Sequence, residues 1–182
     1  MHVFLDFEAS SLADKSFPVE VAWVFEDGRS RTSLLRPAPG WTDWSADAER
    51  IHGLSRERLD KDGAAVEAIA REMVETLSGH QLYASAPSWD GKWLSVLLRA
   101  ANLPRHALRL GKSDDAFKAA ARDILGPTAE EVDVAALVSD IIARTEPDPP
   151  AHRALADAML ELERWRRVRQ TAQEATMARM SR

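Results

Sequence analysis

The stretch VFLDFEASSL, Val3 to Leu12, places two carboxylates, Asp6 and Glu8, inside an otherwise apolar run. The apolar residues predict a buried strand. Because alternate residues of a strand point to the same face, both acids are expected on one face. Like charges at that spacing repel one another, so the pattern indicates either a cation-binding pair or solvated acids on an edge strand.

The segments that follow predict further strands. Val19–Phe25 is rich in β-branched and aromatic side chains, and the segment 30–36 alternates well enough to pair with it across a turn at Glu26–Gly28. The first third of the chain is therefore expected to be antiparallel. Strands are also expected over 81–86 and, from a weaker pattern, near 107–110.

Apolar residues at helical spacing predict that helices cover this sheet. The predicted helices run over 64–78, from 87 to the region of Pro104, from a cap at Ser113, from a capping box at Thr128 and Glu131 to about 143, and from a first turn at Pro150. The connection Arg36–Gly63 is expected to be a long functional loop. The order of elements indicates an α/β class, with a mixed five-stranded sheet that starts antiparallel, finishes parallel and is flanked by helices.

Composition narrows the function classes. The chain has 182 residues, a formal net charge of -5 and no cysteine, which excludes disulfides, thiolate metal sites and a cysteine nucleophile. Its length suits a single domain spanning residues 1–182. No run approaches the ~20 apolar residues of a membrane helix, so a soluble, cytoplasmic protein is expected. The acidic balance disfavours broad electrostatic binding of nucleic acid but permits a small site that holds divalent cations.

Two further segments contain candidate site residues. Asp90 follows a predicted strand at the start of a helix, where an acid either faces a ligand or caps the helix. Asp157 lies in the last predicted helix, five residues after His152. Because five residues rotate a helix by about 140°, both side chains reach one site only if His152 lies on the loop or first turn after Pro149 and Pro150. Taken singly, each residue is explained by a helix cap or a solvated surface.

Taken in order, the pattern Asp6-x-Glu8, Asp90 and His152-x-x-x-x-Asp157 resembles the DEDDh exonucleases of the DnaQ-like, RNase H-fold superfamily. The resemblance spans nearly the whole chain and implies an RNase H-like sheet in a single exonuclease domain. It also implies a metal-dependent 3′-to-5′ exonuclease that releases nucleoside monophosphates from single-stranded DNA, RNA or short oligonucleotides.

The resemblance assigns a role to each motif residue. It implies phosphodiester hydrolysis with two divalent cations, Mg²⁺ or Mn²⁺, which prefer oxygen ligands. Asp6 would bridge both ions, and Glu8 and Asp157 would complete the ion that binds the nucleophilic water. Asp90 would hold the other ion, directly or through water. His152 would deprotonate the water, a role that suits histidine, whose unperturbed pKa is ~6.5.

The resemblance further implies a pocket for the 3′-terminal nucleotide, formed by the chain after the first strand and by the segment RIHGLS, Arg50–Ser55. The residues that would bind substrate are Ala9, Ser10, Ser11, Leu12, His52 and Trp89. Leu12 would act as a wedge, and Trp89 either stacks on a base or belongs to the core. Many small relatives dimerise, so a homodimer is one expected assembly.

The sequence departs from the family pattern in two places. DFEASSL replaces the more familiar DTETTGL, and Ala86 stands where an asparagine often precedes the aspartate of the second motif. These differences bear on substrate contacts and leave the five motif residues intact. The alternative is a catalytically silent RNase H-like module that binds nucleic acid or a protein, and the retention of all five residues argues against it.

Overall fold

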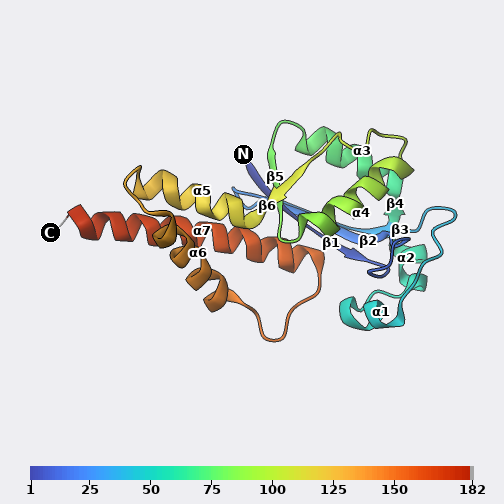
Figure 1. Cartoon of the computed structure of the whole chain (residues 1–182). Coiled ribbons are helices and arrows are strands. Elements are labelled where there is room, and N and C mark those ends of the chain that lie inside the picture. Colours follow the sequence, from blue (N-terminus) through green and yellow to red (C-terminus); the bar gives the residue numbers. More distant parts are fainter. Residues whose placement is uncertain (181–182) are drawn as a thin grey trace.

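The computed structural model describes residues 1–180 and builds this part of the chain around one mixed β-sheet (Figure 1). In the described residues the sheet has six strands in the spatial order β4-β3-β2-β1-β5-β6. The strands are β1 (His2–Ala9), β2 (Pro18–Phe25), β3 (Ser30–Arg36), β4 (Ala64–Ala65), β5 (Gln81–Ala84) and β6 (Leu110–Lys112). β1, β2 and β3 are antiparallel, whereas β5 is parallel to both β1 and β6. The predicted antiparallel start and parallel finish are confirmed, and the strand beyond the expected five is the two-residue β4.

Helices cover both faces of the sheet. They are α1 (Ala46–His52), α2 (Arg56–Asp62), α3 (Val66–Leu77), α4 (Pro87–Ala100), α5 (Ser113–Leu125), α6 (Glu131–Thr145) and α7 (Ala154–Met180). Side chains of α3 and α4 pack with Val3 and Leu5 on one face, whereas side chains of α5, α6 and α7 pack with Phe4 and Val24 on the other. β1 is therefore enclosed on both faces, and its acids interrupt an otherwise buried strand. Up to Met180, none of the helices combines the length and the apolar character that crossing a bilayer requires.

The prediction of one long loop over Arg36–Gly63 is wrong, because this segment contains α1 and α2. Each helix begins at a serine cap: the hydroxyl of Ser45 accepts the Ala48 amide at 3.4 Å, and that of Ser55 accepts the Arg58 amide at 3.2 Å. Both caps are readable in the sequence, but short helices with few apolar residues give little periodic signal.

Four predicted helix starts also need correction. Ser113 is the first residue of α5 and not its cap, α6 begins at Glu131 without a side-chain cap, and α7 begins beyond Pro150, at Ala154. The helix predicted from residue 64 starts at Val66, because Ala64 and Ala65 pair with β3. The start of α7 at Ala154 depends on a tertiary contact, because its first amide donates to a carboxylate from β2. Local sequence signals do not contain this contact.

A glycine at the end of α2 fits a space too small for a side chain. A Cβ on Gly63 would lie 2.8 Å from the carbonyl carbon of Leu35 and closer still to the Arg36 nitrogen and the Leu59 oxygen. These are backbone atoms, so they cannot move aside without displacing α2 from β3.

Gly63→Ala is therefore expected to lower the free energy of unfolding by about 1 to 3 kcal/mol, the usual cost of overpacking. Urea unfolding measures this directly. Gly91→Ala in α4 is the matched control, because a Cβ there meets nothing within 4 Å. It is expected to stabilise the protein by about 0.5 to 1 kcal/mol. Equal stability of the two variants would contradict this account.

Candidate active site

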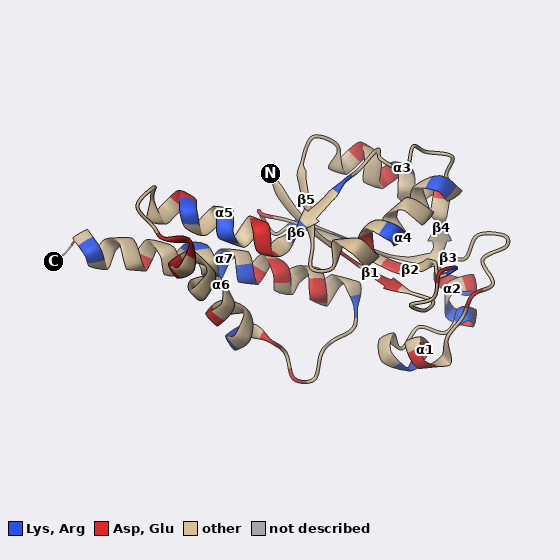
Figure 2. Cartoon of the chain, viewed as in Figure 1, with Lys and Arg blue, Asp and Glu red and all other residues tan. Residues whose placement is uncertain are grey.

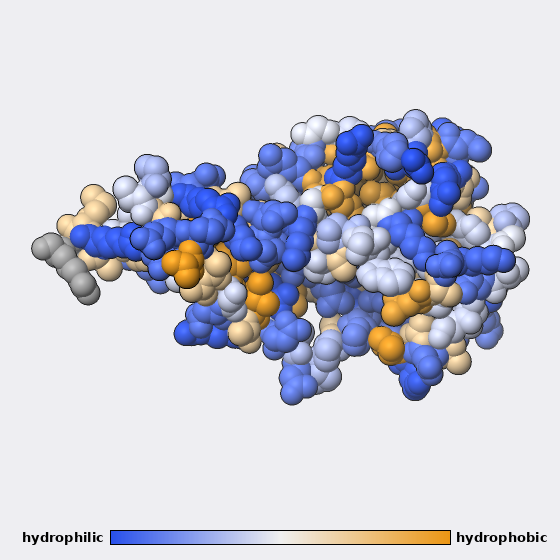
Figure 3. Space-filling view, in the orientation of Figure 1, coloured by the Kyte–Doolittle hydropathy of each residue, from blue (hydrophilic) through white to orange (hydrophobic). Residues whose placement is uncertain are grey.

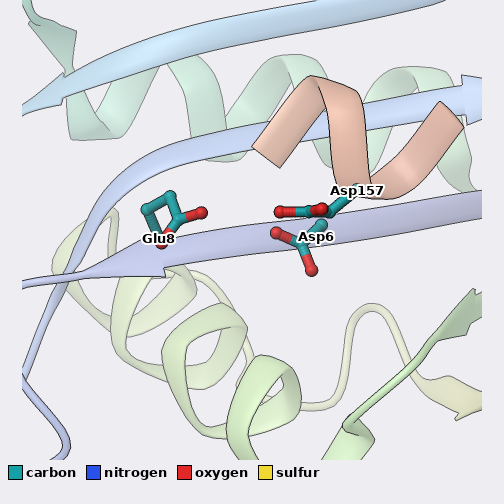
Figure 4. A group of neighbouring side chains, drawn as sticks. All are labelled: Asp6, Glu8 and Asp157. Carbon is teal, nitrogen blue, oxygen red and sulfur yellow. The ribbon is translucent and has the colours of Figure 1, made fainter. Parts of the chain in front are cut away.

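Three carboxylates from two elements meet on one side of β1. Asp6 and Glu8 project from β1, and Asp157 projects from the first turn of α7 (Figure 4). One oxygen of each lies within 4.8 Å of the others. The alternation of the strand brings the first two together, and the packing of α7 on that face adds the third. Hard oxygen ligands at this spacing suit Mg²⁺ or Mn²⁺.

Asp90 approaches the same strand from α4. β1 pairs with β5 only over His2–Phe4, so beyond that point its edge is open and the start of α4 covers it. Asp90 is 2% exposed, and its carboxylate interacts with the Phe7 backbone N–H. Its charge is the largest electrostatic influence that raises the pKa of Asp6. Ala86 occupies the cap of α4, so the explanation of Asp90 as a helix cap is wrong.

These four carboxylates have pKa values above their ordinary range, chiefly because they are poorly solvated. Burial raises the pKa of Glu8 to about 8 and that of Asp90 to about 7. Burial and the neighbouring acids also raise the pKa of Asp6 strongly and that of Asp157 more moderately. Within residues 1–180, none of the four forms an ion pair with a lysine or arginine. Protons or added cations must therefore offset the repulsion.

Two other buried acids nearby are neutralised by arginines. Glu161, one turn after Asp157 on α7, is 5% exposed and lies 2.9 Å from Nη1 of Arg164. Glu20 of β2 is 2% exposed and lies 2.6 Å from Nη2 of Arg153. Arginines thus pair with the buried acids around the cluster, whereas the four motif carboxylates have no such partner in the described part of the chain. That contrast favours a site that is completed by ions from solution.

Glu20 also fixes the start of α7. Its carboxylate accepts hydrogen bonds from Nε of Arg153 at 3.0 Å and from the Ala154 amide at 3.1 Å. The register of β1 and β2 places Glu20 directly opposite Glu8. The Arg153 amide in turn donates to Asp157 at 3.1 Å. One residue therefore joins β2, the beginning of α7 and, through Arg153, a carboxylate of the cluster.

His152 lies on the loop just before α7, as the spacing to Asp157 requires if both side chains address one site. It is exposed and has a positive φ of 47°. Its charge lowers the pKa of Asp157, against the effect of burial. The loop places a titratable group at the solvent side of the cluster.

The end of β1 forms a second local structure beside the carboxylates. The hydroxyls of Ser10 and Ser11 both donate to Oδ2 of Asp43, at 2.7 and 2.6 Å. Ala9 is buried, whereas Leu12 is 70% exposed. The two serine side chains are thus used to hold the 38–45 segment, and Leu12 is the exposed side chain directly after them.

His52 and Trp89 border the same region in different ways. His52 is buried, and its Nδ1 accepts the Leu54 amide at 3.0 Å, so Nε2 carries the proton. That Nε2 is buried, and burial lowers the pKa of the ring, while its interaction with the Ala9 backbone acts in the opposite direction. Trp89 is 38% exposed and stacks on Trp93 with ring centroids 5.7 Å apart. The explanation of Trp89 as a core residue is therefore wrong, because part of this residue is open to solvent.

The sequence reasoning missed Glu20, Arg153 and Glu161. The signal for Glu20 was present, because it is an acid inside the apolar run 19–25, as Asp6 is inside the first run. Arg153 and Glu161 gave no comparable signal, since charged residues in and before a helix are ordinarily solvated.

No family model matches the chain, and no curated protein sequence does. Solved structures of exonuclease I do match it. The complex of Escherichia coli exonuclease I with a dA16 oligonucleotide has a TM-score of 0.67 and 16% identity, over 96% of this chain and 42% of the other. The zinc-bound form of the E. coli enzyme with single-stranded DNA has a TM-score of 0.67 and 16% identity, over 97% of this chain and 42% of the other. Exonuclease I from Methylocaldum szegediense has a TM-score of 0.62 and 16% identity, over 93% of this chain and 41% of the other.

The chain has the fold of exonuclease I. The predicted RNase H-like architecture is thereby confirmed, with the mixed sheet and flanking helices described above. The chain spans less than half the length of each of these exonuclease I chains.

The pKa shifts predict how stability responds to pH and metal. Since the pKa of Glu8 rises from 4.5 to about 8 on folding, its protonation stabilises the metal-free protein fully below pH 4.5. That contribution is lost as the pH rises through about 8. Mn²⁺ replaces the protons, so one fixed Mn²⁺ concentration is expected to raise the melting temperature more at pH 8 than at pH 6. A concentration of 100 times the Kd at pH 8 would stabilise the protein by about 2.7 kcal/mol. Differential scanning fluorimetry at both pH values measures the shift. A Mn²⁺-induced rise in melting temperature that persists in Glu8→Gln, or that does not change with pH, would refute the assignment of these carboxylates as a metal site.

Glu20→Gln is expected to lower the free energy of unfolding by about 1 to 3 kcal/mol, because it removes a charged acceptor from Arg153 and from the first amide of α7. Chemical denaturation measures the loss. Glu163→Gln is the control, since that glutamate pairs with Arg167 on the exposed side of α7. A surface pair of this kind contributes about 0 to 1 kcal/mol. Similar losses in the two variants would show that Glu20 has no special structural role.

Proposed function

We propose that this protein is a metal-dependent 3′-to-5′ exonuclease acting on single-stranded nucleic acid. The observation that carries the proposal is the set of four poorly solvated carboxylates around β1, with no arginine or lysine paired to them in residues 1–180 and with His152 beside them. The fold of exonuclease I supports it, and the solved complexes of that enzyme with DNA oligonucleotides favour single-stranded DNA as the substrate.

The donor set fits two divalent cations. Asp6 shares the cluster with Glu8 and Asp157 and is also raised in pKa by the charge of Asp90, so it is the residue that would be suited to contact both ions. Bound Mg²⁺ or Mn²⁺ would polarise a phosphodiester and lower the pKa of a water ligand. The protein's part is to fix these oxygens on a rigid strand and two helix starts, so that little reorganisation is needed.

His152 is proposed to accept the proton of the attacking water. It lies on a loop at the solvent side of the cluster, next to Asp157. The neighbouring Arg153 is held by Glu20, which fixes the point from which the histidine projects.

The terminal nucleotide is proposed to lie against the chain that continues from β1. Ala9–Ser11 and the exposed Leu12 lie on one side of this space, and the buried Nε2–H of His52 is a donor nearby. Trp89 is partly exposed at the start of α4. A homodimer remains a prediction from the family resemblance alone.

The decisive experiment is hydrolysis of a single-stranded 12-mer labelled at its 5′ end, with Mn²⁺. Wild-type protein is expected to shorten it stepwise from the 3′ end and to release nucleoside monophosphates. Asp6→Asn is expected to reduce the rate to background, and His152→Ala to lower it by about 10² to 10⁴-fold, the usual contribution of a general base. Gel electrophoresis and chromatography of the products give both readouts.

Asp140→Asn serves as the control, because this exposed aspartate pairs with Arg144 on α6, away from the cluster. It is expected to retain full activity. Hydrolysis that survives in Asp6→Asn, or that starts from the 5′ end, would overturn the proposal. Binding of the 12-mer without any hydrolysis would favour the catalytically silent module instead.

A further inference from the structure

One segment of the chain has a charge opposite to that of the remainder. Residues 91–113 contain no aspartate or glutamate, although the whole chain has 29 acidic residues among 182. The segment carries five cations: Lys92, Arg99, Arg105, Arg109 and Lys112. Its formal charge is +5, so the remainder of the chain carries -10. Figure 2 shows blue residues on α4 and at both ends of β6.

Part of this segment forms a cleft beside α4. The cleft has a volume of about 490 Å³, and its polar lining includes Ser95, Arg105, His106 and Arg109. Both arginines are exposed, and within residues 1–180 neither has a carboxylate partner. Nε of Arg105 lies 2.9 Å from Nε2 of His106, so the two side chains are held together. The arginines therefore present unpaired positive charge to whatever enters the cleft.

The floor of the cleft is apolar. Leu94, Leu108 and Leu110 line it between the basic side chains. In Figure 3, orange atoms lie among blue ones in the region of α3, α4 and β6. A floor of this kind with a cationic rim suits a flexible chain that has apolar faces and a charged backbone, as unpaired nucleotides have.

The cleft and the carboxylates share helix α4. Gly91 lines it and directly follows Asp90, so one turn of α4 presents an acid to the site and a glycine to the cleft. Lys112 ends β6, which runs parallel to β5, and lies with Glu161 on a smaller cavity of 160 Å³. Basic residues thus extend from the site along β6 to Arg109. The chain that continues from the proposed pocket for the terminal nucleotide also contacts α4, because Nζ of Lys92 donates to the Ala13 carbonyl at 2.6 Å.

We infer that the cleft lined by Arg105, His106 and Arg109 binds the phosphate backbone of the strand 5′ to the nucleotide that is removed. This rests on the proposed function, because it assumes that the terminal nucleotide lies beside Ala9–Leu12. The strand then crosses the start of α4 and continues over β6. The negative charge of the rest of the protein disfavours other paths for a polyanion.

The test compares Arg105→Ala/Arg109→Ala with wild type in binding a fluorescein-labelled dT 12-mer, by anisotropy in the presence of Ca²⁺. The double variant is expected to bind about 10-fold more weakly. The slope of log affinity against log salt concentration is expected to become shallower by about 1.4, which corresponds to two phosphate contacts on a single strand. Hydrolysis of the p-nitrophenyl ester of thymidine 5′-monophosphate, which has no upstream strand, is expected to stay unchanged with Mn²⁺.

Lys61→Ala/Arg71→Ala is the matched control, because it removes two exposed cations on α2 and α3 that lie outside the segment. It is expected to bind the 12-mer like wild type. An equal loss in the control, or an unchanged affinity and salt slope in the Arg105/Arg109 variant, would show that the cleft does not bind the strand. If the wild type binds the 12-mer through these arginines but hydrolyses neither substrate, the proposed function is wrong and the binding role of the cleft is supported. If the wild type hydrolyses the ester and the Arg105/Arg109 variant binds normally, only the proposed role of the cleft is wrong.

Discussion

Repulsion among four carboxylates is the constraint on which this structure depends. In water such groups separate and ionise, but here β1 and the starts of α4 and α7 hold them in a poorly solvated space. At about 4 Å and an effective dielectric of about 20, each pair of like charges costs about 4 kcal/mol. The sheet, the helix packing and the Glu20–Arg153 pair together keep the acids close. Such an arrangement suits a site that cations from solution would complete, as proposed above.

The surrounding ion pairs show that the acidity of the site is selective. Arg153 and Arg164 neutralise Glu20 and Glu161, which lie beside the cluster but outside the motif. If these arginines paired with Asp6 or Glu8 instead, the carboxylates would no longer be free to bind a divalent ion. Glu20 holds Arg153 in place and Glu161 holds Arg164. Neither arginine is therefore available to pair with the motif carboxylates.

The central strand with Asp6 and Glu8 and the mixed sheet could be predicted from the sequence, because alternation and apolar runs are local properties. Asp90 and Asp157 were added to the site only by the family resemblance. The features that could not be predicted from the sequence depend on tertiary contacts. The start of α7 is satisfied by Glu20 from β2, so a local search for caps placed it too early. Asp90 reaches β1 only because the pairing of β1 with β5 ends at Phe4, a fact about register that spacing does not reveal. The substrate roles of Ser10 and Ser11 were likewise inferred without knowledge of Asp43, which receives both hydroxyls.

That double contact with Asp43 links two parts of the proposed catalytic apparatus mechanically. Ser10 and Ser11 continue the same strand that holds Asp6 and Glu8, so the nucleotide pocket and the ion ligands are parts of one stiff element. A terminal nucleotide that fits poorly against Ala9–Leu12 would push on the chain that sets the spacing of the carboxylates. Selectivity at the strand end would then be expressed as a difference in reaction rate more than in binding strength.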